Sequence, residues 1–238
     1  MVHGYRDIPE RFDHWLIKFN PKNTDTGIKS EGPIELVYAE MAKKSGINMP
    51  ETRLFELSDN ERYFGVRRFD RDKNQRNHVA TVAGLLNADF RVPNFEYDQL
   101  LKLTRYLTND QRQVDSVYRQ MLFNVRMSVK DDHTKNFSFI MSESGQWDLS
   151  PAYDLAPSLG LGGYHTMSIL GEGKDFTNKT LVEIGIMHGL PKNKIKEISD
   201  EVNYGISLWP TLCNEYDIDR EDREIIESLV KSGSPSKE

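Results

Sequence analysis

Cysteine is almost missing from this sequence. Cys213 is the single cysteine among 238 residues, which excludes an intramolecular disulfide and a cysteine-based zinc site. It lies in the apolar stretch LWPTLCNEY, so we expect a buried thiol rather than a reactive one. The six histidines form no H-E-x-x-H motif, which argues against a metal-dependent hydrolase of that kind.

Excess positive charge and long apolar runs are missing as well. The 31 basic residues are outnumbered by 37 acidic ones, and the net charge of −6 gives no reason to expect direct binding to nucleic acid or an anionic membrane. No apolar run approaches the roughly 18 residues of a membrane span. The opening stretch MVHGYRDIPERFDHW has no apolar signal core. We therefore expect a cytoplasmic protein that contacts no membrane.

The chain divides into two parts of different character. Residues 1–94 mix short strands with one helix: DHWLIKF alternates like a strand, EGPIELVYAEMAKKSG has a helical stripe, and TRLFELSDNERYFGVRRFD predicts a hairpin. Residues 95–230 are mostly helical, and residues 231–238 form a polar tail that we expect to be flexible. The pattern predicts an α+β fold. Within 95–230 we expect two helices before residue 128, a strand pair around 137–149, and helices near 179–189, 191–208 and 220–231.

The stretch SVKDDHTKNFSF concentrates hydrogen-bonding side chains in one short turn. Asp131 and Asn136 have the D-x-x-x-x-N spacing of the protein kinase catalytic loop, in which the Asp accepts the proton of the attacking hydroxyl and the Asn binds magnesium. The strand pair that follows returns the chain to this loop and brings a third carboxylate, Asp154, beside it. Magnesium prefers oxygen ligands and takes only one or two from the protein, so Asn136 and Asp154 suit it.

Phosphoryl transfer from ATP also needs positive charge beside the phosphates. Lys18 lies on an early predicted strand, and the helix that follows carries Glu31, Glu35 and Glu40. A strand lysine paired with a helix glutamate holds the α and β phosphates in kinases. Any of the three glutamates is a possible partner, and we favour Glu35.

Each of these features also has an ordinary structural explanation. Asp and Asn are common in loops, a strand lysine is more often solvated than catalytic, and the paired acids of DDH also suit a helix-end turn. His133 alone is more typical of a structural hydrogen bond than of a base. Trp147 and Tyr153 are predicted to be packing residues, and SLGLGGYHT at 158–166 to be a flexible loop. The order of the features along the chain is what favours kinase-like chemistry.

Four motifs together resemble one known family. DDHTKNFSF, LSPAYDLAPS, RRFDR at 67–71 and HTMSI at 165–169 are similar to the signatures of HipA-like serine/threonine kinases, the toxins of bacterial toxin–antitoxin modules. The resemblance extends from about residue 12 to residue 230. It implies a two-lobed protein-kinase-like fold, with a partial N-lobe of short antiparallel strands at 1–94 and a large, mostly helical C-lobe at 95–230.

The resemblance also implies roles for individual residues. Asp131 would be the general base, with His133 and Lys135 supporting the catalytic loop or the phosphates. Asn136 and Asp154 would bind Mg²⁺. The ATP phosphates would meet Lys18, held by Glu35, while the adenine and ribose would meet the hinge, through the backbones of Arg67 and Phe69 and through Asp70.

Partners follow from the resemblance in the same way. The expected substrate is a protein, such as an aminoacyl-tRNA synthetase phosphorylated on a serine, with stalled translation and persistence as the consequence. An antitoxin protein would restrain the kinase.

The sequence departs from the family's pattern at its start. Family members have a small subdomain and a Gly-rich, serine-containing loop before the strand lysine, whereas MVHGYRDIPERFDH has one glycine and no serine. We therefore expect a truncated kinase, weak or inactive alone, that an upstream fragment would complete. The alternatives are a non-catalytic kinase-like module that binds an antitoxin or another protein, and a small-molecule kinase on the same fold.

Overall fold

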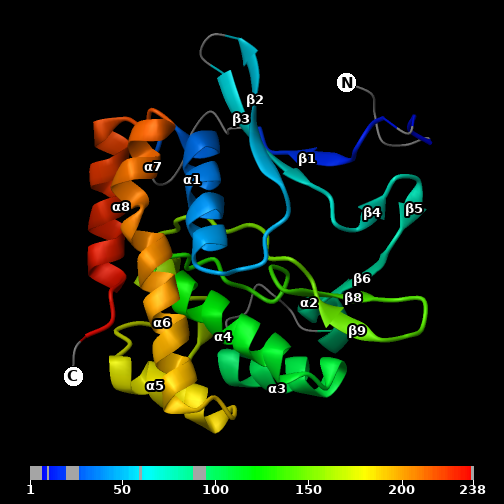
Figure 1. Cartoon of the computed structure of the whole chain (residues 1–238). Coiled ribbons are helices and arrows are strands. Elements are labelled where there is room, and N and C mark those ends of the chain that lie inside the picture. The colour runs from blue at the N-terminus through cyan, green and yellow to red at the C-terminus, as the bar shows by residue number, and fades with distance from the viewer. Residues whose placement is uncertain (1–6, 10, 20–26, 59–60, 88–94, 237–238) are drawn as a thin grey trace.

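The computed structural model describes residues 7–9, 11–19, 27–58, 61–87 and 95–236. Helices and short, mainly antiparallel strands alternate along the chain, which confirms the α+β prediction (Figure 1). The helices are α1 (Glu31–Lys44), α2 (Val82–Leu86), α3 (Tyr97–Thr108), α4 (Gln111–Arg126), α5 (Asn178–Met187), α6 (Lys192–Ser207), α7 (Trp209–Glu215) and α8 (Arg220–Gly233), with a 3₁₀ turn at Leu161–Gly163.

The strands form two small antiparallel sheets and two short ladders. The first sheet has the order β1-β3-β2, from β1 (Trp15–Ile17), β2 (Thr52–Ser58) and β3 (Glu61–Arg67). The second has the order β6-β8-β9, from β6 (His78–Thr81), β8 (Ser138–Met141) and β9 (Trp147–Leu149). The ladders pair β4 (Arg71–Asp72) with β5 (Gln75–Arg76) and β7 (Phe95–Glu96) with β10 (Met167–Ser168). Both strands of the predicted hairpin, β2 and β3, are confirmed, although residues 59–60 of its turn lie outside the described residues.

Helix α1 forms where the apolar spacing predicts it. Its predicted stripe is completely buried, with Ile34 and Met41 at 1% and 0% exposure, and Pro33 lies in the first turn. The helix ends at Lys44. Ser45 is the C-cap, and Gly46 follows it with the left-handed φ of +77° that is typical of glycine just after a helix.

Asp110 is the N-cap of α4, since its carboxylate accepts a hydrogen bond of 2.9 Å from the Arg112 N–H. The apolar face of α4 is buried throughout, as its periodicity predicts. The buried stripe consists of Val114, Val117, Tyr118, Met121, Leu122 and Val125.

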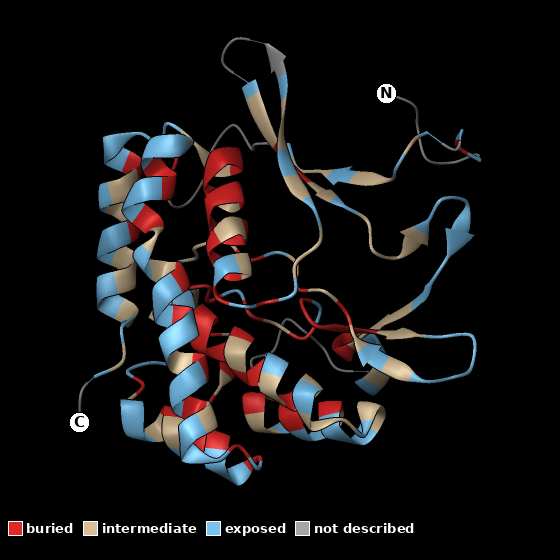
Figure 2. Cartoon of the chain, in the orientation of Figure 1, coloured by how far each residue is buried: buried red, intermediate tan, exposed pale blue. Residues whose placement is uncertain are grey.

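One large apolar core joins most of the helices. Figure 2 shows buried residues concentrated on α1, on α4 and in the loops between them, while α6 and α8 turn exposed faces outward. A smaller cluster of Leu36, Ala39 and Phe64 joins α1 to β3. Helix α1 therefore packs on the first sheet with one side and on α6 and α7 with the other, which fixes it beside the cleft described below.

Several short elements were not expected from the sequence, among them β6, α2 and α7. Strand β6 pairs with β8, which lies far along the chain, so the partner rather than the local pattern decides it. Helix α2 is only five residues long and starts at Thr81, whose hydroxyl accepts from the Gly84 N–H. Helix α7, which buries Cys213, follows α6 directly with Pro210 in its first turn.

The predicted tail begins inside α8, which continues to Gly233. Beyond the helix, the backbone N–H of Ser236 donates to the Phe176 carbonyl at 2.9 Å, and the Ser236 carbonyl accepts from Asn178 N–H at 3.1 Å. These bonds tie the end of the described chain to the start of α5.

Candidate functional site

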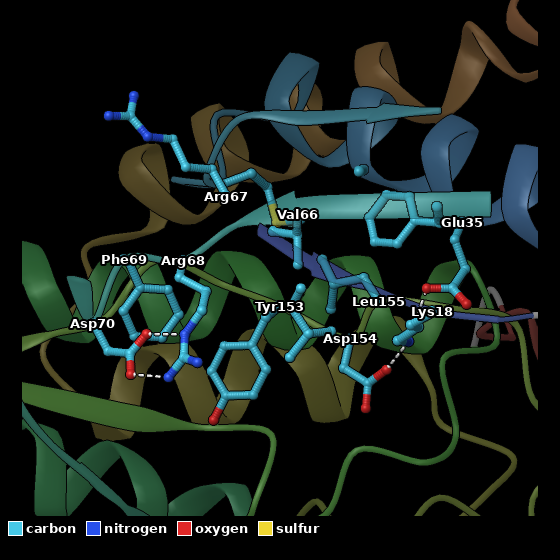
Figure 3. A pocket seen from close by; sticks show the side chains of 14 residues that line it. Lys18, Glu35, Val66, Arg67, Arg68, Phe69, Asp70, Tyr153, Asp154 and Leu155 are labelled. Atoms are coloured by element: carbon cyan, nitrogen blue, oxygen red, sulfur yellow. Dashed lines mark hydrogen bonds and ion pairs between the residues drawn. The ribbon is translucent and has the colours of Figure 1, made fainter. Parts of the chain in front are cut away.

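A cleft of about 370 Å³ lies between the first sheet, α1 and the segment that follows β9 (Figure 3). Its inner wall is apolar and its two ends are charged. Lys18, Glu35 and Asp154 meet at one end, and Asp70 lies at the other. The apolar wall consists of Leu16, Ala39, Met49, Phe64, Val66 and Leu155.

Lys18 is the centre of the charged end. Its backbone N–H donates to the Phe64 carbonyl at 2.9 Å, so the strand pairing fixes where the side chain starts. Its Nζ lies 2.8 Å from Glu35 Oε2 and also donates to Asp154 Oδ1, from the far side of the chain. Burial alone would lower the pKa of Lys18, but the two carboxylates outweigh burial and raise it. Lys18 is therefore a fixed positive charge at the mouth of the cleft.

The three candidate glutamates on α1 occupy different surroundings. Glu35 is the one at ion-pair distance from Lys18, and burial raises its pKa against the opposing effect of the lysine. Glu40 instead accepts from Lys43 Nζ at 2.8 Å. Glu31 lies in the first turn of α1, where burial raises its pKa and the charge of Lys18 lowers it.

Arg67, Phe69 and Asp70 line the other end of the cleft. The Arg67 backbone N–H donates to the Glu51 carbonyl at 2.8 Å, so this donor is already used within the fold. Asp70 accepts from Arg68 Nε at 2.8 Å and from Arg71 Nη1 at 2.6 Å. Burial would raise the pKa of the Asp70 carboxyl, but these guanidinium partners lower it below its ordinary value.

The loop after α4 carries the predicted base and the predicted amide ligand. The Asp131 side chain is 65% exposed, with its carboxylate 3.8 Å from His133 Nε2. The Asn136 side-chain Nδ2 donates to the Asp131 carbonyl at 2.8 Å, and the Asn136 N–H donates to the His133 carbonyl at 2.9 Å. The turn is thus closed on itself, with the Asp131 carboxylate left facing solvent.

Helix α2 supports this loop from outside. Its first residues, Val82 and Ala83, donate their backbone N–H groups to the carbonyls of Phe137 and Thr134 at 2.9 and 3.1 Å. The first N–H groups of a helix have no acceptor within the helix itself. Here the carbonyls of the loop supply those acceptors, and the bonds hold the loop against α2.

Tyr153 connects the loop to the cleft. The sequence predicted a packing residue, but its ring lines the cleft beside Phe69, with ring centroids 5.7 Å apart. Its hydroxyl donates to the Lys135 carbonyl at 2.7 Å and bonds to the Ser138 hydroxyl. Because Asp154 is the next residue, Tyr153 fixes Asp154 relative to the loop that holds Asp131 and Asn136.

Asp132 is a buried acceptor beside the candidate site to which the sequence analysis assigned no role of its own. Unlike its exposed neighbour Asp131, its side chain is 0% exposed. Its carboxylate accepts from the Tyr97 hydroxyl and from His165 Nδ1, each at 2.8 Å, and from the Thr166 N–H at 2.9 Å. The acids of the DD pair therefore have opposite surroundings, a difference that two identical letters in a sequence do not reveal.

The donor set of the predicted cation site suits magnesium. Asn136 uses its amide nitrogen on Asp131, which leaves its amide oxygen for a cation. Asp154 has one oxygen on Lys18 and a second oxygen that is not used in that bond. Hard oxygen donors in this number are what Mg²⁺ takes from a protein when phosphates and water supply the rest. The described residues contain no cluster of three or more His, Cys, Asp or Glu side chains that could hold a metal alone.

The family described as HipA-like C-terminal domain matches residues 2–209 of this chain. The chain belongs to this family. The predicted HipA-like resemblance is thereby confirmed. A Haemophilus influenzae protein named "Putative kinase" is 26% identical over 126 residues, a match that covers 47% of this chain and 37% of that protein.

Two solved structures share the fold. The HipA chain of the Shewanella oneidensis HipA–HipB–operator DNA complex is 17% identical with a TM-score of 0.69, over 92% of this chain and 56% of that one. The Helicobacter pylori proinflammatory kinase CtkA is 13% identical with a TM-score of 0.54, over 91% and 92%. This chain thus spans about half of the HipA chain that it matches. No helix in the described ranges has the length and apolar character needed to cross a membrane.

Proposed function

We propose that this HipA-like chain is the catalytic region of a serine/threonine protein kinase that uses ATP and Mg²⁺. The observation that carries the proposal is the position of Lys18, held between Glu35 and Asp154 at the charged end of an apolar cleft. A half-buried cation fixed by carboxylates from two distant segments has the form of a phosphate site, because the lysine is oriented before any ligand arrives.

The nucleotide would lie along the cleft with its phosphates at Lys18. Its base would pack between apolar side chains of the sheet and α1, such as Leu16 and Ala39, and extend toward Phe69. Because the Arg67 N–H is used by Glu51, a base contact at Arg67 would come from its carbonyl, with Phe69 supplying the second backbone contact. Asp70, kept ionised by its arginine partners, would face the ribose.

The transfer step would take place where the loop meets the cleft. The exposed carboxylate of Asp131 would accept the proton of the attacking serine hydroxyl, since no neighbouring group covers it from solvent as Asp132 is covered. Asn136 and Asp154 would hold magnesium, which when bound neutralises charge on the phosphates. His133 and Lys135 would keep the loop in place, Lys135 through its carbonyl bond to Tyr153.

The substrate and partners are proposed from the family. A protein involved in translation, such as an aminoacyl-tRNA synthetase, is the proposed phosphate acceptor, with growth arrest and persistence in the cytoplasm as the outcome. An antitoxin is the proposed regulator, in line with the Shewanella HipA structure, which holds HipB and operator DNA.

Calorimetric titration of ATP with magnesium, paired with phosphoryl transfer to candidate synthetases, tests the proposal. We expect ATP binding that is weak in this chain alone and that Asp154→Ala abolishes, and phosphoryl transfer that is correspondingly weak. Asp131→Asn should retain binding but lose transfer. Asp200→Asn, an exposed acid on α6 with its side chain 60% exposed, is the matched control and should behave as wild type.

Two outcomes would contradict the proposal. The first is binding that is equal in the wild type and Asp154→Ala, which would place the nucleotide elsewhere. The second is transfer that survives Asp131→Asn. Binding without transfer in the wild type, with every candidate acceptor, would favour a non-catalytic binding module instead.

A further inference from the structure

A second cavity lies behind the catalytic loop and shares no lining residue with the cleft. Its volume is about 210 Å³, and it is enclosed by the residue before Asp131, the glycine turn at 162–163, the segment 174–176 and the end of α8. A liquid water occupies about 30 Å³, so a tetrahedral oxyanion has room here. The lining carries two lysines, Lys130 and Lys174, against one acid, Asp175.

Lys130 is the unusual residue of this cavity. It is only 5% exposed, and within the described ranges it is the one buried residue among the lysines and arginines. Lys18 has two carboxylate partners, whereas the Lys130 ammonium has no hydrogen bond or ion pair to any described residue. Burial lowers the pKa of Lys130, and the charge of Asp175 opposes this change.

Gly160 and Gly233 leave the space that the Lys130 side chain occupies at the cavity. A Cβ on Gly160 would lie 3.0 Å from Lys130 Cβ and 2.1 Å from the Tyr164 carbonyl oxygen, so no other residue fits at a φ of +66°. A Cβ on Gly233 would lie 3.5 Å from Lys130 Cε and 3.8 Å from Nζ. The end of the lysine therefore lies beside the last residue of α8, in space that a larger side chain would fill.

The remaining wall adds polar groups without neutralising the lysine. His165 lines the cavity, and its Nδ1 is bonded to Asp132 while its buried Nε2 has no partner among the described residues. Lys174 Nζ lies 4.5 Å from the centre of the Tyr164 ring at the rim. Among the charged side chains that line the cavity, two lysines thus stand against one carboxylate, that of Asp175.

We infer that this cavity is a second anion site, in which the Lys130 ammonium binds an oxyanion of the phosphate class. The inference goes beyond the proposed kinase activity and does not depend on it. The phosphate could be free or attached to a side chain, and both forms share the chemistry that a lysine recognises.

Binding of an anion at this site would affect the catalytic loop. Lys130 directly precedes Asp131, and its carbonyl accepts from the Thr166 N–H at 3.0 Å and from the Thr166 hydroxyl at 3.1 Å. An anion on the Lys130 side chain would therefore fix the position of the segment around 160–166 relative to the loop that carries the base. This gives the site a means of regulating the loop.

NMR spectroscopy of the whole chain tests the inference. Inorganic phosphate is titrated at constant ionic strength, and the amide signals of Gly162, Gly163 and Gly233 report on the cavity, while the amide of Val66 in β3 reports on the cleft. We expect saturable shifts at the cavity glycines. A parallel titration with O-phospho-L-serine identifies the source, because tighter binding of phosphoserine indicates a phosphorylated side chain and tighter binding of phosphate indicates the free ion.

Variants make the test specific. Lys130→Met keeps the apolar stem and should weaken binding at least about tenfold, whereas Lys196→Met, an exposed lysine on α6, should bind as wild type. If Lys130→Met does not fold, Lys174→Met, whose lysine is exposed at the rim, should still weaken binding by about threefold.

Absence of shifts at the cavity glycines in the wild type would overturn the inference. Shifts that persist unchanged in Lys130→Met, or in Lys174→Met where that variant is used, would also overturn it. ATP binding is scored separately at Val66, so failure of the second site and failure of the kinase proposal give different results.

Discussion

Replacement of Asp132 by alanine should destabilise this protein far more than replacement of its neighbour Asp131. The Asp132 carboxylate is completely buried and accepts four hydrogen bonds. Its removal leaves a tyrosine hydroxyl, an imidazole N–H and two backbone N–H groups without their acceptor. Disruption of a buried charged network typically costs about 3–5 kcal/mol of unfolding free energy.

The magnitude translates into a large thermal shift. In chains of about 150–250 residues, each 1 kcal/mol lowers the melting temperature by roughly 2–4 °C, so Asp132→Ala should lower it by roughly 6–20 °C. Asp131→Ala removes a side chain that is 65% exposed and should change the unfolding free energy by no more than about 0.5 kcal/mol.

Urea denaturation followed by circular dichroism measures both variants under identical conditions. Asp131→Ala is the matched control, because it deletes the same group one position earlier in the same loop. Equal stability losses in the two variants, or a loss below about 1 kcal/mol in Asp132→Ala, would refute the reasoning from burial and hydrogen bonding.

Three further predictions follow from the same geometry. Lys18→Met should weaken ATP binding at least about tenfold and Glu35→Gln should weaken it less, because Asp154 still holds the lysine; equal calorimetric affinities would contradict this. Asp222→Ala should cost about 2–4 kcal/mol in urea denaturation, since two backbone N–H groups before α1 lose their acceptor, while Glu221→Ala beside it, 68% exposed, should cost almost nothing. Burial lowers the pKa of His188 below 6.5, so the unfolded chain takes up the proton first as pH falls; the unfolding free energy should decrease below about pH 6.5, and His188→Gln should lack that part of the pH dependence.

The sequence predicted well the elements that carry their own signals. Helices α1 and α4 have regular apolar stripes, with Pro33 at the start of one and Asp110 at the start of the other. Strand β6 has only four residues, and its place in the sheet depends on β8, which the chain reaches much later. Local patterns fail where a distant partner decides the conformation.

The residues of the candidate site likewise fall into those that the sequence predicted and those that it could not. The spacing of Asp131 and Asn136 and the order of the motifs along the chain identified the side chains that the cleft and its loop contain. The sequence favoured Glu35 but left Glu31 and Glu40 possible, because the partner of Lys18 depends on how α1 is rotated against β1. The sequence also could not show that the Tyr153 ring lines the cleft, because an aromatic ring with a hydroxyl suits a packing position and a cleft position equally.

Two buried aspartates outside the proposed reacting set fix the two sides of this site. Asp222 on α8 accepts from the N–H groups of Lys29 and Ser30, at 3.0 and 2.9 Å, and so anchors the start of the helix that carries Glu35. Asp132 anchors the 131–136 loop in the same manner, through the side chains of Tyr97 and His165 and through backbone N–H groups. Acids of this kind hold backbone in place, whereas the proposed base keeps its carboxylate in solvent. Burial and the type of donor, rather than residue type, therefore separate the residues that build this site from those proposed to react in it.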